Sequence, residues 1–195
     1  TRQLLLVAAS EPTGDATLLW RAADHMGIDR EAAAPAETAG LLEIDTRVRF
    51  RHPLVRSAVY RAATAPEHRH AHAVLAAATD PHTDPDRRAW HRAQSVLGTD
   101  EDAAADLERS ADRALSRGGF CAAAAFLRRA TDLTPDPARR ARRWPAGRTR
   151  RWRRHRRRDL PGAHRPARGR ADCRPRQGHS RLRARRHRPR ERQDP

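Results

Sequence analysis

Residues 39–64 read AGLLEIDTRVRFRHPLVRSAVYRAAT, and this stretch decides how the fold of the chain is interpreted. In its first half, Ile44, Val48 and Phe50 alternate with charged residues on either side of the Asp-Thr pair at 45–46. Alternating apolar and polar residues around such a pair are typical of two antiparallel strands joined by a turn. We therefore predict a small β-hairpin, divided as LLEI-DT-RVRFR.

A helix is expected directly after the hairpin. Pro53 stands where a proline in the first turn favours a helix start. The apolar residues that follow recur at helical spacing, so they should share one face. They predict a buried stripe made of Leu54, Val55, Ala58, Val59 and Ala62.

Two helical patterns precede the hairpin. Apolar residues between positions 18 and 26 fall on one helix face, with Gly14-Asp15 as a start signal and Gly27 as a stop signal. A second pattern runs over residues 30–39. The order helix, helix, hairpin, helix predicts a winged-helix-like element over residues 1–65, although the wing here comes before a helix.

Residues 66–143 carry a run of helical patterns. Pro66 opens one helix, and three more are expected at about 86–97, 101–117 and 120–133. The last pair matches the small-residue and terminal-proline spacing of one tetratricopeptide repeat. About three such repeats are needed to bury a common core, so we expect residues 66–143 to be the start of a longer array. The matching residues are Ala111, Ala114, Ala123, Leu127, Ala130 and Pro135.

Positive charge is concentrated at one end of the chain. All 41 basic residues are Arg, and the formal net charge is +17. Residues 1–143 hold 21 Arg against 20 acidic residues, whereas residues 144–195 hold 20 Arg against 4. The second segment has only Leu160 and Leu182 as large aliphatic residues, too few to offset the entropy of ordering the backbone. We expect residues 144–195 to be a disordered basic tail.

The origin of this tail has two interpretations. The absence of Lys and the heavy use of Ala, Arg, Pro and Gly indicate a GC-rich gene, in which a slipped reading frame yields chains of this composition. The change at about residue 143 is abrupt, so we interpret the tail as frame-shifted. The alternative is a genuine nucleic-acid arm, with Arg on phosphates and with Trp144 and Trp152 stacked on bases.

The chain contains none of the common catalytic motifs. GxxxxGK[ST], GxGxxG, GxSxG and CxxC are all missing from the sequence, so we expect neither an enzyme nor a nucleotide bound by this chain alone. His68 and His72 have the i, i+4 spacing of a zinc pair, but no third ligand is in register. We therefore interpret His68, His70 and His72 as exposed histidines on a polar face, and we expect no metal site.

Membrane association is not expected either. The sequence has no apolar run of about 18 residues, the length of a membrane span. The apolar stretch at Leu4–Ala9 is too short for the core of a signal peptide. We therefore expect a cytoplasmic protein. Because Thr1 is not an initiator Met and an apolar run follows at once, we expect the chain to be a piece of something longer.

Residues 39–64 resemble the large ATP-dependent LuxR-family regulators of actinobacteria, above all in VRFRHPLVRSAVY. These proteins carry an ATPase module, a winged-helix element, a tetratricopeptide-like array and a C-terminal helix-turn-helix. EPTGDATLLWRAADHMGID at 11–29 is similar to the segment before their hairpin. DPDRRAWHRAQ at 84–94 and AAAAFLRRATDLTPDPARR at 122–140 look like the opening of their array. The resemblance covers about residues 1–143.

The resemblance implies a function that the chain cannot complete alone. ATP and Mg²⁺ would be bound by the missing ATPase module, and DNA would be bound by the missing helix-turn-helix. Related signalling ATPases sense nucleotide phosphates with a winged-helix His, and His52 lies at a comparable place. Because free N–H groups at a helix start attract anions, a His there could also face a phosphate.

We thus expect a mainly α fold: a winged-helix-like element at 1–65, the start of a helical array at 66–143, and a basic tail at 144–195. The chain would be a fragment of an ATP-dependent transcriptional regulator, coupling the ATPase module to the remaining helical repeats. An alternative is a small nucleic-acid-binding protein that uses the tail as a non-specific phosphate-binding arm. A third option is a helical adaptor that binds a partner through residues 101–133.

Overall fold

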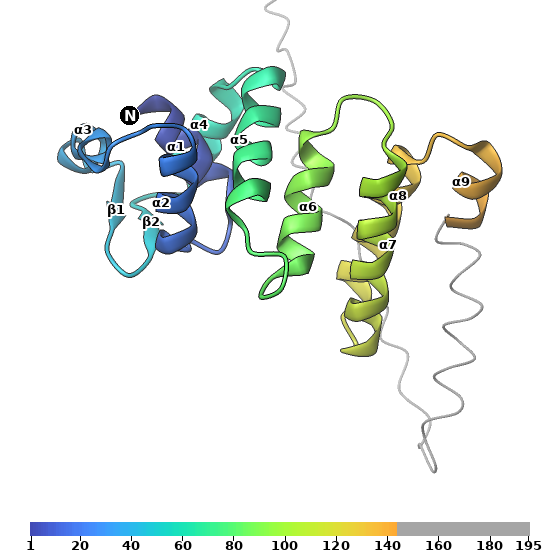
Figure 1. Cartoon of the computed structure of the whole chain (residues 1–195). Helices are drawn as coiled ribbons and strands as arrows, with labels where there is room; N and C mark the ends of the chain where they lie inside the picture. Colours follow the sequence, from blue (N-terminus) through green and yellow to red (C-terminus); the bar gives the residue numbers. More distant parts are fainter. Residues whose placement is uncertain (144–195) are drawn as a thin grey trace, which may run out of the picture. The chain divides into compact units, whose positions relative to one another are not determined.

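The structure is a computed structural model, and it describes residues 1–143 as helices and one short sheet (Figure 1). This confirms the mainly α fold with a small antiparallel hairpin. The predictions for residues 144–195, namely disorder, a slipped frame and nucleic-acid contact, lie outside the described residues. The elements are α1 (Arg2–Ser10), α2 (Ala16–His25), the 3₁₀ helix η1 (Arg30–Ala33), α3 (Ala34–Thr38), β1 (Leu42–Ile44), β2 (Val48–Phe50), α4 (Pro53–Ala62), α5 (Ala65–Ala78), α6 (Pro85–Ser95), α7 (Glu101–Ser116), α8 (Phe120–Leu133) and α9 (Pro137–Arg143).

Local side-chain caps explain why several helices begin where the sequence predicts. Asp15 accepts a hydrogen bond from the backbone N–H of Leu18 at 3.0 Å and caps α2. Thr64 and Glu67 form a capping box at α5, and Asp100 accepts from the N–H of Ala103 at 2.9 Å at α7. Each cap satisfies an N–H group that has no partner within its own helix. The helices predicted near 18–26, 66–78, 86–97, 101–117 and 120–133 are confirmed to within a few residues.

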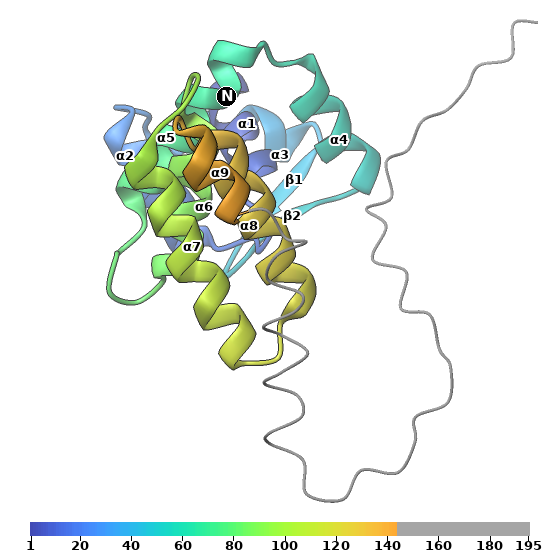
Figure 2. The ribbon, with the colours of Figure 1, turned by 90° about the vertical axis from the view of Figure 1, so that its right-hand side faces the viewer.

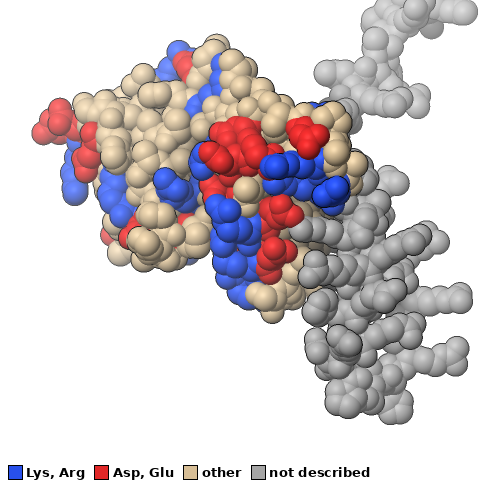
Figure 3. All heavy atoms as spheres, turned by 45° about the vertical axis from the view of Figure 1, so that its right-hand side comes forward, with Lys and Arg blue, Asp and Glu red and all other residues tan. Residues whose placement is uncertain are grey.

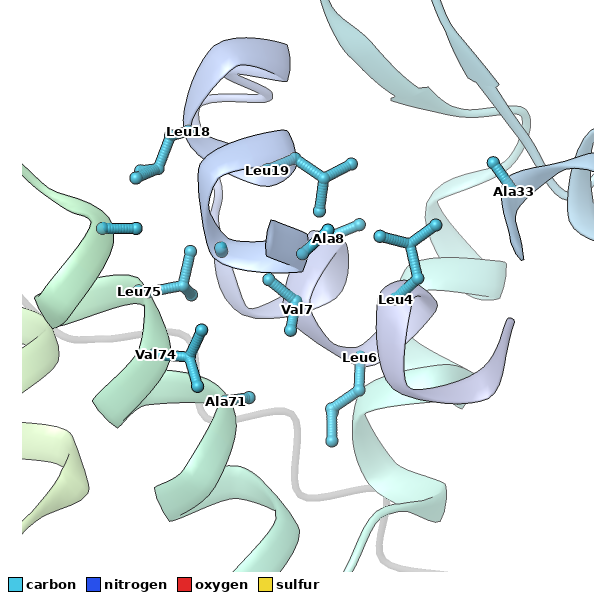
Figure 4. Packing of buried hydrophobic residues seen from close by; sticks show 13 residues of the cluster. Leu4, Leu6, Val7, Ala8, Leu18, Leu19, Ala33, Ala71, Val74 and Leu75 are labelled. Carbon is cyan, nitrogen blue, oxygen red and sulfur yellow. The ribbon is translucent and has the colours of Figure 1, made fainter. Parts of the chain in front are cut away.

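Helix α1 is the most buried element of the described chain, and its sequence pattern did not predict a helix. All seven residues from Leu4 to Ser10 are buried. Leu18 and Leu19 of α2 and Val74 and Leu75 of α5 surround it in one hydrophobic core (Figure 4). A helix that is apolar on all sides has no amphipathic period, and for that reason its pattern did not indicate a helix.

The hairpin lies where the sequence predicts it, but Arg47 belongs to the connection and not to the second strand. The hairpin is fastened to the start of α2. Leu42 pairs with Phe50 and Ile44 with Val48, so Asp45, Thr46 and Arg47 form the connection. The backbone N–H of Val48 donates to the carbonyl of Gly14 at 2.9 Å, beside an isolated bridge between Asp15 and Arg47. The loop before α2 therefore sets the position of β2.

The predicted buried stripe of α4 is wrong. No residue of α4 is buried, and Leu54 is 70% exposed. Val55 and Val59 are half-buried, whereas Ala58 and Ala62 are exposed. The spacing identified one apolar face correctly, but α4 packs mainly on α1, with a small contact to β2, and these two elements cover only part of that face.

Helices α5 to α8 pack against their neighbours in chain order, as antiparallel hairpins joined by short loops (Figures 1 and 2). The predicted stripe of α8 is confirmed, since Ala123, Leu127 and Ala130 are all buried. Many of the contacts are made by alanines, which allow close approach of the helix backbones. Residues buried between α6, α7 and α8 are Ala89, Ala93, Ala103, Ala104, Leu107, Ala130 and Leu133.

Helix α9 was not predicted, because prolines at 135 and 137 indicated the end of the helical pair. Pro137 instead begins a new helix, where its missing N–H costs nothing. Arg143, the last described residue, is 8% exposed, and its guanidinium contacts Glu101 at 2.8 Å and Glu108 at 3.1 Å. It also donates to the Thr134 hydroxyl at 2.8 Å. In Figure 3, acidic and basic side chains lie next to one another on this side of the described chain.

Gly14 is expected to be sensitive to any added side chain. Its φ is +69°, and a Cβ built there would lie 2.5 Å from the Val48 carbonyl oxygen. Gly27 has a similar φ of +64° but nothing within 4 Å of the same position, so it is a matched control. We expect Gly27→Ala to lower the free energy of unfolding by about 1 kcal/mol and Gly14→Ala to lower it by about 2 kcal/mol more. Urea unfolding of both variants would measure this, and equal losses would contradict the proposed clash.

Candidate functional site

Four polar side chains contact one another in series and connect the end of α1 with α6, α5 and α4. Glu11, directly after α1, contacts His91 of α6, with Oε2 and Nε2 separated by 3.0 Å. The Nδ1 atoms of His91 and His72 of α5 are 2.9 Å apart. The Nε2 atom of His72 lies 3.4 Å from the hydroxyl of Tyr60 on α4. Glu11, His72 and His91 are 5%, 5% and 1% exposed. We call these four residues the relay.

The relay corrects the prediction that the histidines of α5 lie on an exposed polar face. His70 is exposed and His68 is half-buried, but His72 is buried. Helix α5 packs on α6, and Tyr60 of α4 reaches both histidines: its ring lies 4.1 Å from that of His68, centroid to centroid, and its hydroxyl lies 3.4 Å from Nε2 of His72. The partner of His72 is 19 residues away in sequence, so spacing within one helix could not reveal it.

The carboxylate of Glu11 is ionised in spite of its burial. Burial alone would raise the pKa of Glu11, but hydrogen bonds from His91 and Thr13, aided by the nearby Arg87 guanidinium, lower it to about 2. The backbone N–H of Thr13 donates to the Oε1 atom of Glu11 at 2.7 Å. Burial and the imidazoles of His91 and His68 lower the pKa of His72 to about 4, and Glu11 offsets only part of that shift. His72 is therefore neutral near pH 7.

The ionised carboxylate fixes the first proton position of the relay. A carboxylate only accepts hydrogen bonds, so the Nε2 atom of His91 must carry a proton. When Nε2 carries the only ring proton of His91, its Nδ1 atom is bare and accepts from the Nδ1–H of His72. The Nε2 atom of His72 is left as an acceptor that faces the Tyr60 hydroxyl. In this tautomer, buried Glu11 sets the polarity of a ring nitrogen two side chains away.

The relay is linear and does not converge on a common centre. Within residues 1–143, no group of three or more His, Cys, Asp or Glu side chains is arranged to hold a metal ion. Although His68 and His72 have the spacing of a zinc pair, the ring of His72 is instead hydrogen-bonded to His91. The arrangement instead resembles the carboxylate–imidazole pairs that orient a ring and fix its tautomer.

His52 lies at the start of α4, as predicted, and is exposed. Its Nδ1 atom accepts a hydrogen bond from the backbone N–H of Leu54 at 3.1 Å, so the ring acts as the N-cap. One of the free N–H groups expected at this helix start is thus satisfied by His52 itself. Its role as a sensor of nucleotide phosphates stays a prediction.

The comparisons with known proteins leave the family open. No protein-family model, no curated protein and no solved structure matches this chain. No helix within the described residues combines the length and apolar character that crossing a bilayer would require.

Acid should destabilise the folded state through the relay. Both shifted groups have lowered pKa values, so their contributions are fully present above the unfolded pKa and are lost as the pH falls. The window is 6.5 to about 4 for His72 and 4.5 to about 2 for Glu11. Each shift corresponds to a loss on the order of 3 kcal/mol in the free energy of unfolding. Urea unfolding between pH 7 and pH 3 would measure it.

Replacing Glu11 tests whether its carboxylate causes the loss of stability in acid. Glu11→Gln should lower the free energy of unfolding by about 1–3 kcal/mol near pH 7 and remove most of the extra loss below pH 4.5. Glu31 is exposed, and Glu31→Gln should change stability by less than about 0.5 kcal/mol. An unchanged pH dependence in Glu11→Gln would show that the carboxylate is not coupled to the histidines.

Proposed function

We propose that this chain is part of an ATP-dependent transcriptional regulator of the LuxR type. Residues 1–65 would form its winged-helix-like element, and residues 66–143 would begin its tetratricopeptide-like array. The ATPase module would bind ATP and Mg²⁺, and a helix-turn-helix elsewhere in the parent protein would bind DNA. The part described here would couple the ATPase module to the array and would carry no complete activity of its own.

The uncovered apolar face of α4 is the observation that supports this proposal best. Leu54, Ala58 and Ala62 are spaced one turn apart and are all exposed. Leu54 is 70% exposed, and α4 has no buried residue at all. A ten-residue helix with an apolar face gains most of its stability by burying that face against a neighbour. The ATPase module of the parent protein is the neighbour that we propose.

A ligand-driven shift of α4 would reach the helical array through α1. The Nε atom of Arg56 on α4 donates to the carbonyl of Ala9 on α1 at 2.9 Å. Helix α1 packs on α5, and α5 packs on α6. This physical connection supports a coupling role, which requires two states of α4 that the ATPase module would favour differently. His52 would present its Nε2 atom to nucleotide phosphates, since its Nδ1 atom is already hydrogen-bonded.

A charged residue on the exposed face of α4 should block docking. Leu97 is 79% exposed and lies in the loop after α6, so it offers a matched apolar control. In the parent protein we expect Leu54→Glu to abolish nucleotide-dependent activation of transcription, whereas Leu97→Glu should leave it intact. Placing a charge in a buried interface costs several kcal/mol, so association should weaken by at least about a hundredfold.

The gene itself provides the first test. We expect the reading frame upstream of Thr1 to encode a strand, a GxxxxGK[ST] loop and a helix. We also expect a one-base shift near codon 143 to restore an Ala/Leu-rich helical continuation. A start codon immediately before Thr1, with no such loop in any upstream frame, would overturn the proposal. Equal loss of activation in Leu54→Glu and Leu97→Glu would argue against α4 as the docking face.

A further inference from the structure

A groove opens beside the relay, and its chemistry is separate from the uncovered face of α4. It has a volume of about 570 Å³, which is in the range of small-molecule sites. Tyr60, at one end of the relay, and its neighbour His72 both line it. The full lining is Ala9, Ser10, Pro12, Pro53, Arg56, Ser57, Tyr60, Arg61, His72, Trp90 and Gln94.

The groove is positively charged. Arg56 and Arg61 line it, and no Asp or Glu does. Within residues 1–143 eight arginines form ion pairs with carboxylates, but neither Arg56 nor Arg61 is among them. Two guanidinium groups that line one groove, with no carboxylate in its lining, favour an anionic ligand.

The groove also offers an aromatic wall. Trp90 lines it, and its ring contacts that of Phe126 edge-on, with the centroids 6.1 Å apart. An indole presents a flat apolar surface at little cost in side-chain entropy. The groove therefore combines an indole wall, two cationic groups and the buried imidazole of His72.

We propose that this groove binds a small aromatic carboxylate that carries a hydroxyl group. The carboxylate would pair with Arg61 and Arg56, the ring would lie against Trp90, and the hydroxyl would donate to the Nε2 atom of His72. The Tyr60 hydroxyl contacts that nitrogen at 3.4 Å, which is long for a hydrogen bond between oxygen and nitrogen. An incoming hydroxyl can therefore replace it at small cost.

The relay also gives this site a defined route for a proton. If the ligand hydroxyl ionises, its O–H bond breaks and an N–H bond forms at the Nε2 atom of His72. The proton on the Nδ1 atom of His72 then moves to the Nδ1 atom of His91, where it lies next to the Glu11 carboxylate. His72 ends neutral, the ligand oxygen carries the negative charge left by the broken O–H bond, and His91 gains one positive charge. The charged and titratable groups that face His72 are Tyr60 on α4, His68 on its own helix, His91 on α6 and Glu11 after α1, with Arg87 near Glu11.

A ligand held here would touch α1, α4, α5 and α6 at once, since the lining residues come from these elements and the loop after α1. Its binding would restrain α4, the helix whose exposed face we propose as the docking surface. The groove is nevertheless inferred from its own geometry, so it can be right even if the regulator proposal fails.

The test uses the whole chain and 4-hydroxybenzoate as the probe. We expect saturable binding by calorimetry in the micromolar to millimolar range. Benzoate lacks the hydroxyl and phenol lacks the carboxylate, so each should bind about tenfold more weakly.

Variants of the protein test the same contacts. Arg61→Gln should weaken binding of 4-hydroxybenzoate about tenfold, while Arg49→Gln, at an exposed hairpin residue outside the groove, should leave its affinity unchanged. Tyr60→Phe should retain binding, because it removes only the competing hydroxyl.

Nitrogen-15 spectra of the imidazole rings give a second readout that does not depend on affinity. In the free protein near pH 7 we expect a bare Nε2 and a protonated Nδ1 in His72, and the Nε2 signal should move with 4-hydroxybenzoate but not with benzoate. No saturable binding up to about 10 mM would overturn the proposal. Equal effects of Arg61→Gln and Arg49→Gln, or a protonated Nε2 in free His72, would overturn it as well.

Discussion

The complete burial of α1 is the constraint on which the described structure depends. Seven consecutive residues of this helix are removed from water, so other elements must cover it on every side. Helices α2, α4 and α5 provide that cover, and the hairpin is fastened to the loop before α2. Burying the side chains of Leu4 and Val7 alone contributes several kcal/mol, because each such side chain is worth about 2 kcal/mol. Without α1, α4 would lose the element that it chiefly packs against.

The end of α1 also places the relay. Glu11 follows the last turn of the helix, and burial of α1 brings its carboxylate against α6, 80 residues further along the chain. A buried carboxylate without hydrogen-bond partners would destabilise the folded state by several kcal/mol, so Glu11 must be fully hydrogen-bonded where it is buried. Here both carboxylate oxygens are hydrogen-bonded, one by His91 and one by Thr13. The relay thereby fixes how α1 meets the helical hairpin of α5 and α6.

Further along the chain, alanine packing and surface ion pairs together position helices α6 to α9. Alanine contacts between α6, α7 and α8 allow close approach, but each buries little area. Ion pairs then lie across the same helix interfaces: Asp86 of α6 binds Arg113 of α7 at 2.6 Å, and Glu101 of α7 binds Arg143 of α9 at 2.8 Å. Partly exposed pairs of this kind contribute little energy singly, but their geometry favours one register of the helices over others.

Much of the local structure follows from the sequence alone. The caps at Asp15, Thr64 and Asp100, the hairpin around Asp45 and the first-turn proline of α4 all act over three or four residues, so their effects can be seen in a short window. The stripe of α8 was predicted for the same reason, since its spacing reflects the geometry of one helix. Helix α1 was not predicted, because a helix that is buried on all sides has no polar face and therefore no amphipathic period in its sequence.

Only the tertiary structure decided which faces are covered and which polar groups meet. The apolar face of α4 was evident from its spacing, but its exposure depends on what packs against it, and α1 covers only one side. His72 looked like one of several surface histidines until the fold placed His91 and Glu11 beside it, from 19 and 61 residues away. Sequence patterns report periodicity within an element, whereas burial and side-chain pairing are set by contacts between elements that are distant in the chain.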